Sequence, residues 1–589
     1  MADQYDPHAR MTRTIRRRER VDDSVLQGDW PSQLSPLLRR VYAARGAHSY
    51  ALAQPRLNQL LPPDALLGID AAARLLADAM AADRHIVVVG DFDCDGATAC
   101  AVAVRGLRLL GATQVSYAVP NRIVHGYGLS AALVEDLAGM RPDLLVTVDH
   151  GIACHAGIAS AKARGWQVLV TDHHLPGEHL PPADVIVDPN LPGDAFPSKA
   201  LAGVGVMFYV LLALRRHLRD AGRFAADPPD LSVLLDLVAV GTVADLVPLD
   251  ANNRVLVAAG LRRLRAGHGC AGLRALIDVS RKQAATLTAS DIGFSMAPRI
   301  NAAGRLEDMA LGIECLLCDQ PSRARELAEV LDGINAERRG VQQQMVGDAE
   351  AAIAALSFDV DSGRATVCLY REDWHPGVVG LVASKIKERV HRPAIAFAPS
   401  DAGSDQLRGS ARSIPGFHIR DALAAVDAQH PGLIEKFGGH AMAAGLSLRL
   451  IDLPRFQAAF ETCAAAMLSP ELLQDVILSD GAMPPEACDI RTALALRDGG
   501  PWGQGFAEPL FDDVFEVVGW KVLGEQHLKL ELTRPGSAAQ RVNAIHFSGW
   551  SGEPPAQRSR IAYRLQPDDW RGGDAVQLIV VHREAASVE

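Results

Sequence analysis

Between residues 86 and 250, short runs of β-branched residues alternate with longer segments whose apolar positions have helical spacing. Short continuous apolar runs are typical of strands buried on both faces, and helices between such strands imply parallel pairing. The pattern therefore predicts an α/β fold with a doubly wound, mostly parallel sheet. The expected strands are Ile86–Gly90, Val115–Val119, Leu144–Val148, Val168–Thr171 and Val185–Val187.

The pattern changes on either side of this sheet. An alanine-rich amphipathic stretch before it predicts helices that cap the sheet, and a polar stretch after it predicts one long connecting helix. A second α/β domain follows, and the last part of the chain has short strands bounded by turns, which indicates a small barrel of the OB type. We expect an N-terminal tail and helical cap (1–82), the main α/β domain (83–320), the connecting helix (321–357), the second α/β domain (358–470) and an OB-like nucleic-acid-binding domain (475–589).

Acidic and histidine residues follow three of the predicted strands. Asp91, Asp93 and Asp95 follow the first strand, Asp149-His150 follows the third, and Asp172-His173-His174 follows the fourth. The carboxyl ends of parallel strands lie at one edge of a sheet, so these side chains should converge. Clustered carboxylates repel one another unless a hard divalent cation binds them. The sequence therefore predicts a metal site.

These motifs are also compatible with two alternatives. The Asp-x-Asp-x-Asp-Gly spacing also opens an EF-hand loop, but the twelfth position is Val102 instead of Glu and a strand precedes the loop instead of a helix. Each single motif could also be structural, because Asp149 could form a turn and His173 or His174 could be an interior hydrogen-bonded histidine. The three motifs together favour the metal site.

The apolar helical segment Leu231–Asp250 contains two further carboxylates. A carboxylate in such surroundings is costly unless it is paired or binds a metal. Asp245, next to a Gly-Thr break, is the candidate for a further ligand. Asp236 could support the ligands or lie on the helix surface.

Three segments carry candidate phosphate contacts. Guanidinium groups suit phosphate oxygens, although those in residues 291–309 could instead pair with Glu307 or Asp308. Residues of the segment LRGSARSI alternate, so in an extended strand they share one face. The segment KFGGH is predicted to open a helix, where a Gly-Gly-His turn makes an anion site or a simple capped turn. The candidates are Arg299, Asn301 and Arg305; Arg408, Ser410 and Arg412; and Gly438, Gly439 and His440.

Aromatic and basic residues alternate in the β-rich C-terminal part. Stacking combined with positive charge is what single-stranded nucleic acid requires, although some of the rings could be barrel core. These residues are Trp520, Lys521, His527, Lys529, Arg541, His546, Phe547 and Trp550.

Composition adds few constraints. The chain has 589 residues, and 48% of them are hydrophobic. Its net charge of −11 does not indicate nucleic-acid binding, but a negative total is compatible with a local basic surface. No apolar run is long enough to span a bilayer and no signal-peptide core is present, so we expect no membrane contact. Nine irregularly spaced cysteines indicate reduced thiols in the cytoplasm. We expect Arg16, Arg17, Arg18 and Arg20 to lie on a frayed, solvated tail.

The motifs together resemble a known family. GDFDCDGATA, VPNRIVHGYGLS, VTVDHGIA and VTDHHLPG, in this order, are similar to the phosphoesterase motifs of the DHH superfamily. APRINAAGR, GSARS and KFGGHAMAAG are similar to the RecJ branch and its DHH-associated domain, and the β-rich tail resembles the OB domain of that branch. The resemblance extends from about residue 40 almost to the end of the chain.

The resemblance implies a single-strand-specific 5′ to 3′ DNA exonuclease that uses two Mn²⁺ or Mg²⁺ ions, with a role in DNA repair and recombination. It implies single-stranded DNA as the main partner of a monomeric protein, with a single-strand-binding protein and a helicase as further candidates. Two rival functions remain, a DHH phosphodiesterase for small nucleotides and a non-catalytic single-strand-binding scaffold. The barrel argues against the first rival, and the complete acidic set argues against the second.

The resemblance also assigns roles to individual residues. Asp149 would bridge the two ions with His150 beside it, and His174 would face the scissile phosphate as a catalytic group. Asp172 would orient its neighbours or bind metal. The metal ligands would be Asp91, Asp93, Asp95, Asp149, His173 and Asp245. Backbone phosphates, including the 5′ end, would contact Arg122, Arg299, Ser410 and Arg412.

Overall fold

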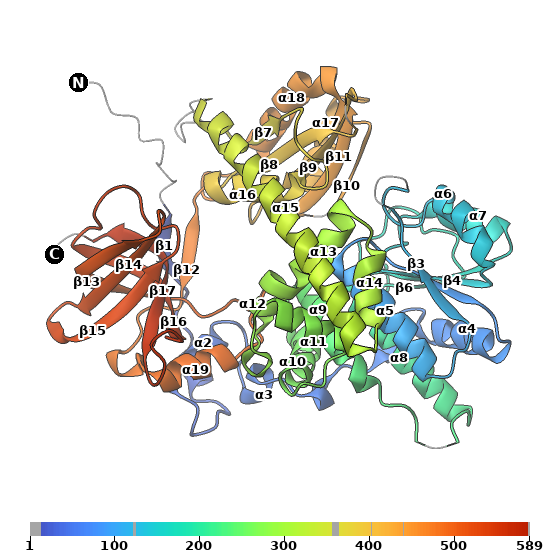
Figure 1. The fold of residues 1–589 in the computed structure, drawn as a ribbon, viewed down its shortest axis with the longest axis horizontal. Coiled ribbons are helices and arrows are strands. Elements are labelled where there is room, and N and C mark those ends of the chain that lie inside the picture. The colour runs from blue at the N-terminus through green and yellow to red at the C-terminus, as the bar shows by residue number, and fades with distance from the viewer. Residues whose placement is uncertain are drawn as a thin grey trace. The chain divides into compact units, whose positions relative to one another are not determined.

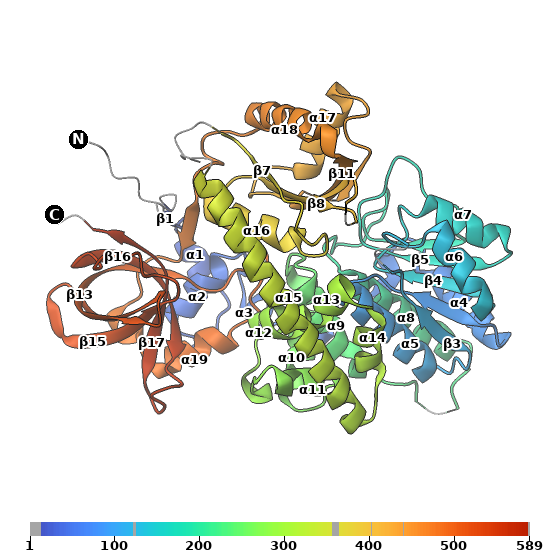
Figure 2. The same cartoon turned by 45° about the horizontal axis from the view of Figure 1, so that its top comes forward.

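The computed structural model describes residues 13–121, 125–225, 227–355, 364–401, 403–439 and 441–586, with side chains for all of these except 350, 352–355 and 537–540. Figures 1 and 2 show the chain as a ribbon with its elements labelled. By its internal contacts the chain divides into two compact units. One unit consists of Arg20–Asn335 with Leu494–Glu508, and the other of Met1–Glu19, Ala336–Ala493 and Pro509–Glu589.

A five-stranded parallel sheet forms the centre of the first unit. Its strand order is β3-β2-β4-β5-β6, and every neighbouring pair is parallel. This confirms the doubly wound α/β prediction. The strands are β2 (Ile86–Val89), β3 (Val115–Ala118), β4 (Leu144–Val148), β5 (Gln167–Thr171) and β6 (Val185–Val187).

Helices cover both faces of this sheet because its strands are apolar on both sides. One face packs Val87, Val89 and Leu145 against α6 (Ala131–Leu137) and α7 (His155–Ala163). The other face packs against α5 (Cys94–Leu109) and α8 (Gly203–Asp220), with α4 (Ile69–Ala81) against α8 and β6.

Further helices complete the first unit. Tyr42 of α2 stacks on Trp502 with ring centroids 5.8 Å apart, so the N-terminal cap packs against the segment Leu494–Glu508 as well as the sheet domain. The long helix α15 (Pro321–Ala355) begins in the first unit and ends in the second, which confirms the predicted connecting helix over the residues described. The remaining helices are α1 (Asp23–Leu26), α2 (Pro36–Ala43), α3 (Tyr50–Ala53), α9 (Leu235–Ala244), α10 (Ala251–Arg265), α11 (Ala271–Val279), α12 (Ala289–Asp291), the π-helical turn η6 (Ile292–Met296), α13 (Ala297–Leu306) and α14 (Ala310–Leu317).

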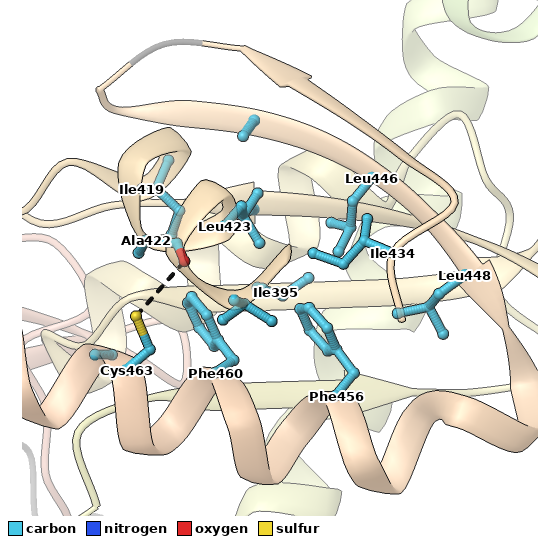
Figure 3. Close-up of a cluster of buried hydrophobic side chains, with 14 of the residues drawn as sticks. Ile395, Ile419, Ala422, Leu423, Ile434, Leu446, Leu448, Phe456, Phe460 and Cys463 are labelled. Atoms are coloured by element: carbon cyan, nitrogen blue, oxygen red, sulfur yellow. Dashed lines mark hydrogen bonds between the residues drawn. The ribbon is translucent and has the colours of Figure 1, made fainter. Parts of the chain in front are cut away.

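The second unit contains the predicted second α/β domain. Its sheet has the order β10-β11-β9-β8-β7, and Phe456 and Phe460 of α18 pack onto it (Figure 3). In that core the thiol of Cys463 donates to the carbonyl of Ala422 at 3.6 Å. The elements are β7 (Val367–Tyr370), α16 (Val379–Val390), β8 (Ala394–Pro399), β9 (Gln406–Arg412), α17 (Ile419–Gln429), β10 (Lys436–Gly439), β11 (Ala443–Arg449) and α18 (Leu453–Met467).

The last five strands close into a barrel of order β13-β14-β15-β17-β16, which Figure 2 shows as a ring. This confirms the OB-like prediction. The strands are β13 (Phe511–Leu523), β14 (His527–Arg534), β15 (Ser537–His546), β16 (Arg558–Pro567) and β17 (Val576–Ala585), preceded by α19 (Ile490–Asp498).

The prediction of a frayed basic tail was wrong for the residues described. β1 (Thr14–Arg17) pairs in parallel with β12 (Val476–Ser479), and Ile15 is buried with Leu510 and Ala562. Arg17 forms an ion pair with Asp512 at 3.0 Å. Because arginines surround Ile15 in the sequence, the local pattern did not indicate that Ile15 anchors β1.

The predicted helix after KFGGH was also wrong. Residues 436–439 and 443–449 form the antiparallel strands β10 and β11. Ala444, Leu446 and Leu448 are buried at alternating positions, which is the period of a strand. Gly438 and Gly439 therefore lie on a strand instead of a helix N-terminus, and His440 lies outside the described residues.

Among the described residues, none of the helices combines the length and the apolar character that crossing a bilayer requires.

Candidate metal centre

The candidate site lies where the strand order of the parallel sheet reverses. The chain places β3 on one side of β2 and then β4 on its other side, so the connections leave the carboxyl ends of β2 and β4 in opposite directions. Such a switch point leaves a crevice in which α/β proteins bind ligands. Asp91 follows β2 and Asp149 follows β4, so both carboxylates flank this point.

Three overlapping groups of side chains there could each hold a cation. They are Asp91, Asp93 and Asp149; Asp149, His173 and His174; and Asp95, His173 and Asp245. Within each group one ligand atom per residue lies within 4.8 Å of the others. Asp149 and His173 each belong to two groups, so the three sets form one continuous acidic centre. The sequence prediction that residues from separate strand ends meet here agrees with the positions of Asp91, Asp149 and His173, and Asp245 joins them from the end of α9.

Asp149 and His173 have the geometry of shared metal ligands. His173 Nε2 lies 3.0 Å from Asp149 Oδ1 and 3.7 Å from Asp245 Oδ2. Both Asp149 Oδ1 and His173 Nε2 are buried without a hydrogen-bond partner among the described residues. Buried polar atoms are normally satisfied, and mixed carboxylate and imidazole ligands suit Mn²⁺ and similar cations. The donor set therefore fits a divalent metal.

Glycines allow the backbone to approach these carboxylates. A Cβ atom on Gly96 would lie 2.6 Å from the backbone nitrogen of Asp91, and one on Gly203 would lie 2.5 Å from the Cβ of Asp149. Asp149 itself has a φ of 64°, which a non-glycine residue rarely adopts. The backbone at the end of β4 is thus held in an unusual conformation that directs this side chain into the centre.

The acids of the first motif have different local partners. Asp93 caps α5 by accepting from the backbone N–H of Gly96 at 3.0 Å. Both carboxylate oxygens of Asp95 accept from the first backbone N–H groups of α8, at 2.6 Å from Gly203 and 3.1 Å from Val204. Asp95 therefore fixes α8 against the centre in addition to facing His173 and Asp245.

Burial disfavours the charged form of three carboxylates of the centre. Burial raises the pKa of Asp149 well above its usual value, and Asp95 and Asp93 raise it further. Burial also raises the pKa of Asp95, followed by the charge of Asp245. The pKa of Asp245 is raised as well, first by burial and against the opposing effect of His173. A bound divalent cation would reverse this, because its charge favours the carboxylates.

His174 is the basic group of the centre. Its Nδ1 lies 2.7 Å from Asp172 Oδ1. Burial alone would lower the pKa of His174, but the charge and hydrogen bond of Asp172 outweigh burial and raise it to about 9. Asp172 also accepts from the backbone N–H groups of Ile152 and His173, so it fixes the whole turn after β5.

His150 belongs to none of the three groups. Its ring is fully buried, and Nε2 bonds to the carbonyl of Val89 at 3.1 Å. Burial lowers its pKa to about 4, so it stays neutral. His150 ties the end of β4 to the end of β2, which gives it a structural position and not a place beside the ligands.

Asp236 fits neither role that the sequence left open for it. It is buried, and its Oδ2 accepts from the backbone N–H of Cys270 at 2.7 Å, directly before α11. It anchors a helix away from the three groups of ligands.

The sequence reasoning missed Asp188. This fully buried residue directly follows β6, at the same sheet edge as the other acids. Burial and then the charge of Asp172 raise its pKa to about 7. The signal was present, because the run VIVDPN places an acid after the fifth predicted strand.

Comparison with known proteins identifies this arrangement. The chain matches three family models, the DHH family N-terminal domain over residues 85–242, the DHHA1 domain over 362–466 and the RecJ OB domain over 479–582. It is 46% identical over 575 residues to the single-stranded-DNA-specific exonuclease RecJ of Salmonella typhimurium, covering 96% of this chain and 98% of that protein.

The chain belongs to the RecJ family.

Solved RecJ structures share its fold. A crystal structure of RecJ from Thermus thermophilus in complex with Mn²⁺ has a TM-score of 0.80 and 30% identity, covering 97% of this chain and 80% of that one. The structure of RecJ from the same organism in complex with Mg²⁺ has a TM-score of 0.75 and 28% identity, covering 97% and 78%. The predicted family and its metals, Mn²⁺ or Mg²⁺, are therefore confirmed.

In this RecJ-family chain, the predicted phosphate contacts have varied partners. Arg299 pairs with Asp332 at 2.8 Å instead of Glu307 or Asp308. Asn301 accepts from the backbone N–H of Cys94 at 2.8 Å, so it helps to fix the first turn of α5. Arg305 lies in the last turn of α13. Arg122 lies outside the described residues.

The strand β9 presents Arg408, Ser410 and Arg412 on one face, as predicted, because its alternate residues are buried. Arg412 Nη1 donates to Ser410 Oγ at 2.9 Å. A Cβ atom on Gly380 would lie 2.8 Å from Arg412 Nη2 and 3.0 Å from Ser410 Oγ. Gly380 is in the first turn of α16, so a helix N-terminus, a guanidinium and a hydroxyl meet here, as in anion sites.

Aromatic rings are exposed on strand β13 and in two loops of the barrel. Trp520, 45% exposed, stacks on Trp550 with ring centroids 5.5 Å apart, and Phe547, 56% exposed, contacts His527. Trp570, which the sequence reasoning missed, is 94% exposed between β16 and β17. The loop between the fourth and fifth strands, which contains Trp570, is one of the loops that bind oligonucleotides in OB folds.

Proposed function

We propose that this chain is a single-stranded-DNA-specific 5′ to 3′ exonuclease that hydrolyses phosphodiester bonds with two Mn²⁺ or Mg²⁺ ions and acts in DNA repair and recombination. The observation that carries the proposal is the continuous acidic centre, in which Asp149 and His173 each belong to two groups of metal ligands. Membership of the RecJ family supports the choice of substrate.

The ligands divide naturally between two ions. Asp91, Asp93 and Asp149 would hold one, and Asp95, His173 and Asp245 the other, with Asp149 and His173 between them. Paired ions of this kind activate a water and stabilise both oxygens of an in-line phosphoryl displacement. Asp95 also bonds to the start of α8, so it acts as a support as well as a ligand.

His174 is the residue that we assign to the reacting phosphate. Asp172 holds it and raises its pKa, which favours the protonated form that donates a hydrogen bond to a phosphoryl or leaving oxygen. Asp149 acts in catalysis through the metal. His150, predicted as catalytic, fits better as a residue that aligns the ends of β2 and β4.

Basic groups of both units would bind the DNA backbone. Ser410, Arg412 and the first turn of α16 form the anion site that fits a terminal 5′ phosphate. Asn301 would contact DNA only through its amide N–H groups, because its oxygen caps α5. The other proposed contacts are Arg122, Arg299, Arg305, Arg408, Gly438, Gly439 and His440.

The barrel would hold the strand away from the cut. Lys521 and Lys529 lie directly opposite each other in the register of β13 and β14, a placement of like charges that an anion relieves. The exposed rings of Trp520, Phe547 and Trp570 provide faces on which bases stack. A substrate of only one or two nucleotides would not need the lysine pair and the exposed rings of the barrel. This disfavours the alternative function, a DHH phosphodiesterase that acts on small nucleotides.

The cellular setting is part of the proposal. All nine cysteines are free thiols, which supports a reducing compartment, the cytoplasm. We further propose a monomer that works beside a helicase and a single-strand-binding protein, since an exonuclease specific for single strands needs a supplier of unwound DNA. We also keep the predicted division into five segments, 1–82, 83–320, 321–357, 358–470 and 475–589.

A digestion assay tests the function. Oligonucleotides labelled at the 5′ or 3′ end are offered as single strands, as duplexes and with a blocked 5′ end, in Mn²⁺ or in chelator. We expect nucleotide release only from unblocked single strands in metal, and Asp149→Ala should abolish cleavage while single-strand binding persists. Cleavage by Asp149→Ala in excess Mn²⁺ would contradict the assignment, and cleavage of dinucleotides but not of long strands would favour the rival.

A further inference from the structure

Tyr127 occupies an unusual place beside the metal centre. It lies between β3 and α6, flanked by Gly126 with a φ of 75° and Gly128 with a φ of 69°. A Cβ atom on Gly128 would lie 2.7 Å from Cys154 Sγ and 3.4 Å from His150 Nδ1. The loop is thus packed tightly against the sheet end directly after Tyr127, which limits how far the backbone at Tyr127 can shift.

The ring of Tyr127 joins two other rings at the rim of the centre. It meets Phe92 edge-on with centroids 5.7 Å apart and His174 edge-on at 6.3 Å. The backbone of Phe92 packs closely against α13, because a Cβ atom on Gly304 would lie 2.0 Å from the carbonyl oxygen of Phe92. Phe92 and Tyr127 therefore form a preorganised aromatic corner next to the catalytic histidine.

The tyrosine is not required to orient His174. Asp172 already fixes that imidazole through the 2.7 Å hydrogen bond to Nδ1. Tyr127 nevertheless keeps half of its surface, 50%, open to solvent although it stands among the carboxylates of the centre. An exposed aromatic face that is held rigid beside a phosphodiester-cleaving centre is suited to stack on a base.

We propose that Tyr127, backed by Phe92, stacks on the nucleobase of one of the two nucleotides that flank the scissile phosphodiester. The inference rests on the proposed exonuclease function and adds a contact that positions the strand for cleavage. Stacking does not depend on the identity of the base, because every base has a π face, so this contact serves an enzyme that must accept any sequence.

The test compares wild type, Tyr127→Phe and Tyr127→Leu on three single strands, one intact and two with an abasic site at the first or second nucleotide. We expect Tyr127→Leu to lower kcat/KM on the intact strand about tenfold and Tyr127→Phe to change it by less than about threefold. On one of the two abasic strands, Tyr127→Leu and wild type should be equal, because no base remains to stack. Thermal unfolding midpoints check that both variants are folded.

Two results would overturn the inference. An equal loss by Tyr127→Leu on all three strands would mean that the ring acts through His174 or the loop, and an unchanged rate on the intact strand would mean that it does not contact the substrate. Failure of the exonuclease proposal looks different, because wild type would then release no nucleotides from any strand, and the inference would fall with it.

Discussion

His173 Nε2 and Asp149 Oδ1 lie 3.0 Å apart, and neither atom has a hydrogen-bond partner among the described residues. Buried polar atoms normally have a bonding partner. Two such atoms that lie close together without a hydrogen bond are suited to bind one divalent cation, which would satisfy both. This relationship links the motif after β4 to the motif after β5 and makes the acidic centre continuous.

The two histidines of the centre should respond differently to substitution. His174→Gln should lower kcat about a hundredfold or more, since we assign His174 to the reacting phosphate. His150→Gln should mainly destabilise the fold, by about 1–3 kcal/mol, because it loses the bond to the carbonyl of Val89. Single-turnover rates and thermal unfolding separate the two effects, and a larger catalytic loss in His150→Gln than in His174→Gln would reverse our assignment.

Arg412 should decide how strongly a 5′ phosphate is recognised. Arg412→Ala should raise KM about tenfold for strands with a 5′ phosphate and much less for strands with a 5′ hydroxyl. Arg412→Lys keeps the positive charge but lacks the planar guanidinium that can donate two hydrogen bonds to one phosphate. Its affinity should therefore lie between those of Arg412→Ala and wild type. Equal losses on both strands would show that Arg412 does not contact the terminal phosphate.

The barrel should become less stable at low pH because Asp512 becomes protonated. Burial alone would raise the pKa of Asp512, but hydrogen bonds from Arg17, Ser479 and Arg560 outweigh burial and lower it. A group whose pKa is lower in the folded state stabilises that state above its unfolded pKa, about 3.9, and loses this effect as the pH falls toward the folded value.

The matching measurement follows thermal unfolding of wild type and Asp512→Asn by tryptophan fluorescence from pH 8 to 3. The variant should be less stable by about 3 kcal/mol at neutral pH, and the difference should shrink below about pH 4. Asp569→Asn, which changes an exposed carboxyl, is the control. A difference that stays constant down to pH 3 would refute the role of this carboxylate.

Trp570 should contribute to the binding of long strands. Trp570→Ala should weaken binding of a long single strand about tenfold by removing a stacking face, and Trp570→Phe should restore most of the affinity. Binding of a dinucleotide should not change. Fluorescence anisotropy with labelled strands of two lengths measures this, and identical affinities in wild type and Trp570→Ala would exclude the barrel loop from the interface.

The sequence predicted where the acidic and histidine residues gather, because the position of a strand end depends on topology alone. Parallel strands must end at one edge, so acids after β2, β4 and β5 meet whatever their rotamers. His150 shows the limit of this argument, since it directly follows Asp149 yet points to the carbonyl of Val89. Which way a side chain turns after a strand depends on packing that the sequence pattern does not reveal.

Segments of small or charged residues were the least predictable. The run AMAAGLSL has few large apolar residues, so its strand period was masked and a helix was predicted in place of β11. The basic run before Arg18 carries one apolar residue, Ile15, and its burial depends on β12 about 460 positions away. Long-range pairing of this kind has no local signal.

Calorimetric titration with Mn²⁺ tests the central claim most directly, because it counts ions without requiring cleavage. Wild type should bind two Mn²⁺ ions, and Asp149→Asn should weaken both by about 10–100-fold, since Asp149 belongs to the group of the first ion and lies 3.0 Å from His173, which belongs to the group of the second. Asp236→Asn, a buried acid outside these groups, should bind both ions as wild type does. Unchanged binding of two ions by Asp149→Asn would contradict the account.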